Sequence, residues 1–237
     1  MNGLTPGVAA LLPLAGTLLA YEAGLRLQRR LGGNALANPV LIAVLLVAAA
    51  VRATGLPLAE YEDGVRPLIL LLGPATVALA LPLHRSLPRI RSALVPVLAS
   101  VAAGAVTASA SAVAIVAALG GPDLLLRSIA TKSATAAIAM AVARDIGGDP
   151  ALAAGIAVLT GISGAVICAW VLDWAGVRDP RARGLATGVV AHGIGTARML
   201  AIDAEAGAFS GLALGLAGFA AGVMIPLAAA WLRREIG

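Results

Sequence analysis

Eight long apolar segments, separated by short polar stretches, limit this chain to one class of fold. They cover about residues 4–27, 38–55, 64–83, 92–119, 123–146, 150–174, 183–202 and 207–232. Each is close to the roughly 20 residues that a helix needs to cross a bilayer. Only 12% of the residues are charged, against about a quarter in a soluble domain. The sequence therefore predicts an all-α polytopic membrane protein that forms a single membrane domain over residues 1–237.

The distribution of arginine predicts how the segments cross the membrane. Arginines follow the first, third, sixth and eighth segments, whereas the other loops are poor in arginine or acidic, as at Asp203 and Glu205. Basic loops face the cytoplasm, and eight full crossings would separate the basic loops after segments three and six. One segment between them must therefore enter and leave on the same face, and residues 123–146 are the best candidate. We expect about seven transmembrane helices plus this re-entrant segment, with the N-terminus outside and the C-terminus inside, which places Asp203 and Glu205 outside.

This topology makes residues 38–119 and 150–232 two units of opposite orientation. Their middle segments align at Gly73–Thr76 and Gly193–Thr196, which read Gly-Pro-Ala-Thr and Gly-Ile-Gly-Thr. Proline and clustered glycine both disfavour a continuous helix. Inverted repeats with discontinuous helices that meet at the midplane are typical of secondary transporters. We therefore predict two inverted repeats with broken helices. Asn38 before Pro39 is predicted to cap the second helix.

The segment around residues 184–200 contains groups that are unusual in the middle of a membrane helix. They are His192, Gly193, Gly195, Thr196 and Arg198. Broken backbone at membrane depth must be buried in protein or line a watery cavity, and an ionisable residue there indicates a functional site. His192 either relays a proton or hydrogen-bonds across helices. Arg198 either grips a carboxylate through its two-pronged guanidinium or pairs with Asp203 or Glu205 at the membrane edge.

Lys132 is the one lysine among 17 basic residues, and it lies in the middle of the fifth apolar segment. Its compact ammonium has three donors and suits a small carboxylate. The alternative is that the side chain extends to the membrane interface. Hydroxyl side chains near the predicted breaks complete the candidate substrate-binding set: Thr76, Ser133, Thr135 and Thr196.

Other functional classes lack support in the sequence. Cys168 is the single cysteine, which excludes an internal disulfide or a metal-thiolate cluster. The chain contains no Walker loop, zincin pair, nucleophile elbow or cluster of metal ligands. We therefore expect neither an enzyme nor a cofactor, and the coupling ion, H⁺ or Na⁺, stays open. The net charge of +5 comes from arginines at segment ends, which orient a membrane protein and do not indicate nucleic-acid binding.

Five stretches of the chain together resemble the LrgB/CidB family. They are Asn38–Leu41, Leu72–Ala80, Lys132–Thr135, Ala191–Arg198 and Glu205–Leu216. Two departures lie in the fifth segment. Thr131 stands where the family typically has proline, and Ala136 with Ala137 replaces a typical Thr-Pro pair.

The resemblance implies two functions. Bacterial members are commonly named antiholin-like proteins, act with a small holin-like partner of the LrgA/CidA type, and are linked to murein hydrolase activity and autolysis. The similar plant plastid protein carries glycolate and glycerate, and bacterial relatives are associated with pyruvate. We interpret the chain as an alternating-access transporter of small monocarboxylates such as glycolate, glycerate, pyruvate or lactate, in the cytoplasmic membrane of a bacterium. The alternative is an antiholin-like regulator. A homodimer is expected, although the small-residue face Ala99–Ala114 suits internal packing equally well.

Overall fold

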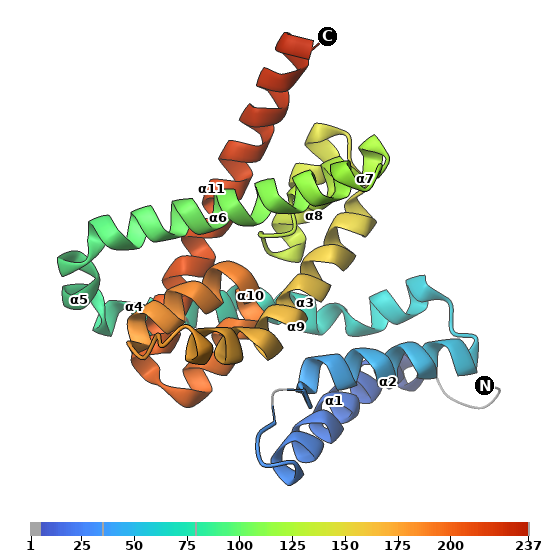
Figure 1. Ribbon diagram of the computed structural model, residues 1–237. Coiled ribbons are helices and arrows are strands. Elements are labelled where there is room, and N and C mark those ends of the chain that lie inside the picture. The colour runs from blue at the N-terminus through green and yellow to red at the C-terminus, as the bar shows by residue number, and fades with distance from the viewer. Residues whose placement is uncertain (1–5, 35, 79, 237) are drawn as a thin grey trace. The chain divides into compact units, whose positions relative to one another are not determined.

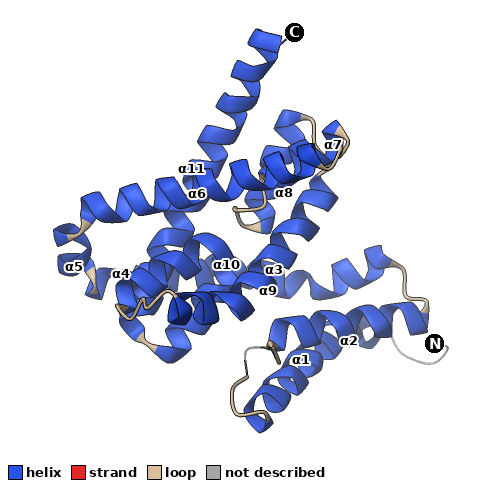
Figure 2. Ribbon diagram, in the orientation of Figure 1, coloured by secondary structure: helices blue, strands red, loops and turns tan. Residues whose placement is uncertain are grey.

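The computed structural model describes the backbone of residues 6–34, 36–78 and 80–236. It describes the side chains of residues 11–34, 36–71, 74, 77–78, 80–81 and 84–231. Every secondary-structure element in these ranges is a helix (Figure 2), as the composition predicts. The chain forms two compact units, Met1–Ala80 and Leu81–Gly237, and each is described by itself. The division falls inside the first predicted repeat unit, so the inverted repeat stays a prediction.

The first unit contains α1 (Pro6–Arg30), α2 (Pro39–Thr54) and α3 (Leu58–Ala78). The predicted cap is confirmed, because the Oδ1 atom of Asn38 accepts hydrogen bonds from the N–H groups of Val40 and Leu41 at 2.9 and 3.2 Å. The predicted interruption at Gly73–Pro74 is not found, since α3 includes Pro74 and continues to Ala78. A proline removes one helical hydrogen bond and bends the helix, but membrane helices tolerate it. The side chain of Thr76 lies outside the described residues.

Eight helices follow in the rest of the described chain. They are α4 (Ala80–Arg85), α5 (Leu87–Ser92), α6 (Leu94–Ala118), α7 (Asp123–Ala130), α8 (Ala136–Ile146), α9 (Pro150–Trp174), α10 (Pro180–Ile202) and α11 (Ala204–Ile236). Among the described residues, four helices are long and apolar enough to cross a membrane, namely α6, α9, α10 and α11. The helix α2 is apolar but has only 16 residues. The chain is thus a multi-pass membrane protein, but the expected seven crossings are not confirmed.

The fifth apolar segment is interrupted in its middle, as predicted. The helices α7 and α8 are separated by a turn at Thr131–Thr135 and fold back on one another (Figure 1). The second half of α7 is joined to the outer end of α8, because the Nη1 atom of Arg127 donates to the carbonyl of Ile146 at 2.9 Å. The N–H group of Asp149 donates to the Oγ atom of Ser128 at 2.9 Å. The segment is therefore a helical hairpin that begins and ends on the same side.

The helix α10 also doubles back, and this was not predicted. His192 has φ 49° and ψ −135°, which is not helical and divides α10 into residues 180–191 and 193–202. A Cβ atom on Gly195 would lie 2.6 Å from the Cγ2 atom of Thr187. In a continuous helix these two residues would be about 12 Å apart along the axis. The break lies at His192, one residue before the predicted Gly193–Gly195.

The packing of α10 against α11 confirms this reversal. Gly184 packs on the backbone of Ala206, and Gly188 packs on that of Ser210, so residues 180–191 run parallel to α11. Thr196 also contacts Ser210, so residues 193–202 return in the opposite direction. Because glycine has no side chain, Gly184 and Gly188 let the helix backbones approach closely, as small residues four apart do in membrane helices. Although α10 is long enough to cross, it begins and ends on the same side.

This second hairpin changes the predicted topology. The Nε atom of Arg89 lies 3.4 Å from the Oε1 atom of Glu205, and Glu205 is within electrostatic range of Arg181. Arg89 and Arg181 therefore share one face of the second unit, as predicted. The expected position of Glu205 on the opposite face is wrong, because the seventh segment returns to the side from which it started.

Candidate functional site

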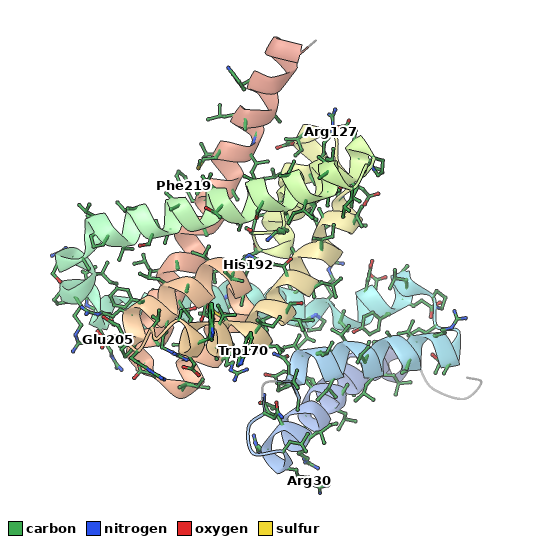
Figure 3. The ribbon with its side chains drawn as sticks, in the orientation of Figure 1. Arg30, Arg127, Trp170, His192, Glu205 and Phe219 are labelled. Atoms are coloured by element: carbon green, nitrogen blue, oxygen red, sulfur yellow. The ribbon has the colours of Figure 1, made fainter. Side chains whose placement is uncertain are left out.

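The tips of the two hairpins meet inside the second unit. The turn Thr131–Thr135 forms one tip, and His192 forms the other. The imidazole of His192 hydrogen-bonds to the backbone of Ser133 and lies within electrostatic range of the Lys132 ammonium. Figure 3 places His192 in the interior of this unit, away from the charged end at Glu205. Two groups of predicted site residues about 60 positions apart are thus brought together.

The two hairpins approach from opposite faces. The helix α6 begins just after Arg89, α9 ends just before Arg181, and α10 begins and ends on that same basic face. The α7–α8 hairpin connects the other ends of α6 and α9. The helices α6 and α9 each have 25 residues, so each spans about 37 Å. The meeting point of the tips therefore lies between the two faces of the unit.

His192 combines two energetically unfavourable features. Its side chain is only 5% exposed, and its buried Nε2 atom has no hydrogen-bond partner among the described residues. Leaving a buried polar atom unpaired costs about 1–3 kcal/mol. Its φ of 49° is a conformation that a residue other than glycine rarely adopts, at a cost of about 1–3 kcal/mol. Strain and an unpaired polar atom in one residue indicate a functional role.

A pair of hydroxyl groups supports the backbone at His192, which is the apex of the α10 hairpin. The hydroxyl of Thr196 donates to the carbonyl of His192 at 2.8 Å, and Thr196 Oγ1 lies 2.9 Å from the Oγ atom of Ser210. A carbonyl can only accept, so the single hydroxyl proton of Thr196 is used there and Ser210 donates to Thr196. All three residues are buried. Thr196 therefore holds the apex in place, and its direct contact with a substrate stays a prediction.

Lys132 is a half-buried cation without an acidic partner among the described residues. Its backbone N–H bonds to the carbonyl of Ile129 at 3.1 Å, which places it in the turn after α7. Thr135 ends this turn and caps α8, where its Oγ1 atom accepts from the N–H of Ile138 at 3.4 Å. Ser133 is buried between them. The tip thus presents a positive charge that nothing in the described chain neutralises.

Two helix N-termini lie at the same place. The helix α8 begins at Ala136, directly after the Lys132 turn, and the second half of α10 begins at Gly193, directly after His192. The first N–H groups of a helix have no partner within the helix, and the helix dipole makes that end positive. Together with Lys132, these features favour the binding of a small anion.

Arg198 lies away from the tips. Its Nη1 atom donates to the carbonyl of Ala165 on α9 at 2.9 Å, about 9 Å along the helix from the apex. Of the two alternative partners, Glu205 pairs with Arg89 instead, and the Oδ1 atom of Asp203 accepts from the N–H of Ala206. Arg198 therefore joins α10 to α9, and a grip on a substrate carboxylate stays a prediction.

Sequence reasoning missed the contribution of α9 to the site. Gly161 lies beside the apex, where a Cβ atom would be 3.3 Å from the Ile194 side chain and 3.8 Å from Nδ1 of His192. Gly164 likewise packs on Ala191. The sequence signal for this contact was the spacing of Gly161 and Gly164, three residues apart in a mostly apolar helix, because small residues allow close helix packing. Among the described residues, no group of three or more His, Cys, Asp or Glu side chains could hold a metal ion.

Comparison with known proteins gives matches over most of the chain. The model of the LrgB-like family matches residues 17–231. An uncharacterised protein of Haemophilus influenzae is 31% identical over 89% of this chain and 90% of its own. The holin-like protein CidB of Staphylococcus epidermidis is 28% identical over 92% and 95% of the two chains. The antiholin-like protein LrgB of Bacillus cereus is 26% identical over 89% and 92%. No solved structure matches the chain.

Proposed function

The chain belongs to the LrgB-like family, and within that family we propose that it is a membrane transporter of small monocarboxylates such as glycolate, glycerate, lactate or pyruvate. One observation carries this proposal. Two hairpin tips meet at an unpaired Lys132, beside two helix N-termini and the buried side chain of His192. Discontinuous helices whose N-termini point at an anionic group are a recurrent substrate site in secondary transporters.

The fixed charges at the tips favour the binding of an anion. A carboxylate is costly to bury without compensation, and each helix N-terminus contributes roughly half a positive charge. Lys132 adds a full charge, and no acidic side chain in the described chain pairs with it. A small carboxylate would therefore replace water with fixed positive groups when it enters the site.

The opposite approach of the two hairpins supports alternating access. Movement of the α7–α8 tip would open the site towards one face of the unit, whereas movement of the α10 tip would open it towards the other. A substrate held between the tips could then be exposed to the two sides in turn. The single domain, the homodimer and the bacterial cytoplasmic membrane belong to this proposal, and the matched relatives are bacterial proteins.

The test is uptake of labelled lactate and pyruvate into liposomes that contain only this protein. Lys132→Met should lower the apparent affinity by about 30-fold or more, because losing a charge-assisted contact costs about 2–5 kcal/mol. Arg144→Met is the matched control, since it removes an exposed cation from the last turn of α8 in the same hairpin. Uptake by the Lys132 variant equal to that of the wild type would refute the site, provided that both variants elute as folded protein.

A second candidate function is antiholin-like regulation through a holin-like membrane partner. The observation that favours it is the names of the relatives, holin-like CidB and antiholin-like LrgB, and these names fit regulation better than transport. If regulation is the function, the protein alone should carry no acid into liposomes. It should instead co-purify with a small holin-like protein and change the autolysis rate of cells that express both.

A further inference from the structure

We propose that Nε2 of His192 accepts a hydrogen bond from a hydroxyl group next to the substrate's carboxylate, so that the site prefers 2-hydroxy acids to 2-oxo acids. This inference rests on the proposed substrate site at the hairpin tips. It assigns to one buried atom the choice between substrates of the same size and charge.

The hydrogen-bond partners of the ring identify the accepting atom. The imidazole is hydrogen-bonded to the backbone of Ser133, whereas Nε2 has no partner among the described residues. The bond to Ser133 therefore involves Nδ1. A backbone carbonyl can only accept a hydrogen bond, so Nδ1 carries the proton. In a neutral imidazole the other nitrogen then has a free lone pair, and Nε2 is an acceptor.

The burial of His192 keeps this lone pair away from bulk water. The side chain is 5% exposed, so bulk water does not satisfy Nε2. The ring lies within electrostatic range of the Lys132 ammonium, and its own backbone precedes the N-terminus of residues 193–202. A carboxylate bound to these positive groups would place the substituent on its neighbouring carbon near the imidazole.

The chemistry of that substituent decides the strength of binding. A 2-hydroxyl group donates to Nε2 and satisfies the buried acceptor. A 2-oxo group offers only lone pairs, and an unsubstituted carbon offers nothing, so both leave Nε2 unpaired. Because an unpaired buried acceptor is costly, lactate should bind about tenfold or more tightly than pyruvate or propionate.

The experiment measures binding to the purified full-length chain by isothermal titration calorimetry. The ligands are the two lactate enantiomers, pyruvate and propionate, which all have three carbons and one carboxylate. We expect at least one lactate enantiomer to bind about tenfold more tightly than pyruvate and propionate. His192→Asn should reduce this ratio to less than about twofold. Asparagine, like histidine, is enriched at positive φ relative to most residues. It keeps an amide donor for the Ser133 carbonyl, but it lacks an atom at the Nε2 position.

His192→Gly is the second variant, because glycine adopts φ 49° without strain, and it should lose the same selectivity. Equal binding of lactate and pyruvate by the wild type would overturn the role of His192, and so would selectivity that survives in both variants. Liposome uptake of both acids would leave the proposed transport intact in either case. If no acid binds or is carried, the proposed function and this inference both fail. Selective binding without uptake would support the inference and remove transport.

Discussion

Replacing Gly195 with alanine tests the reversal of α10 directly. The new Cβ atom would lie 2.5 Å from the Cβ of Ala191 and 2.6 Å from the Cγ2 of Thr187. Neither neighbour can move easily, because the first is fixed to the backbone and the hydroxyl of Thr187 lies 3.3 Å from the Sγ atom of Cys168. The two halves of the hairpin must therefore separate. Overpacking of this kind typically costs about 1–3 kcal/mol.

Gly193 provides the matched control, since a Cβ atom there would meet nothing within 4 Å. Alanine at Gly193 should be neutral or stabilise the following helix by up to about 1 kcal/mol. Thermal unfolding in detergent measures the difference, and a protein of this size loses about 2–4 °C in Tm per kcal/mol. Gly195→Ala should therefore lower the Tm by about 2–12 °C. Equal Tm values for the two variants would refute the packed hairpin, because only the hairpin makes the two glycines unequal.

Two further predictions concern the faces of the unit and the support of the apex. In a Cys168→Ser background, cysteines placed at Arg89 and Glu205 should react with a membrane-impermeant maleimide from the same side, whereas labelling from opposite sides would show that α10 crosses the membrane. Thr196→Val and Ser210→Ala should each lower stability by about 1–3 kcal/mol. A double-mutant cycle in thermal or chemical unfolding should show that their effects are coupled, and additive effects would contradict the shared hydrogen-bond network.

Much of the local structure could be predicted because it depends on neighbouring residues. The cap of α2 by Asn38 needs only a short polar side chain before Pro39. The fifth segment breaks around Lys132, between α7 and α8, where polar residues interrupt an apolar run. The lengths of α6 and α9 follow from hydropathy and the bilayer thickness.

The fate of two helix-breaking sequences could not be predicted in the same way. Gly73–Pro74 lies within one helix, whereas the chain reverses at His192. Local propensity favours a break at both places. At His192 the reversal also needs contacts that are distant in the sequence, such as the bond between Thr196 and Ser210. Likewise, Arg198 donates a hydrogen bond to the carbonyl of Ala165 on α9, and no spacing in the sequence indicates this contact.

The sequence by itself determined that this chain is a helical membrane protein with charged and polar residues in the middle of two apolar segments. Hydropathy and helix capping act over a few residues, so they can be read along the chain. Only the tertiary structure decided that α10 turns back, that Glu205 joins Arg89 on one face, and that His192 reaches the Lys132 turn. These features depend on whether the two halves of α10 form one continuous helix or fold back on each other. Contacts between segments that are far apart in the sequence decide between these two arrangements.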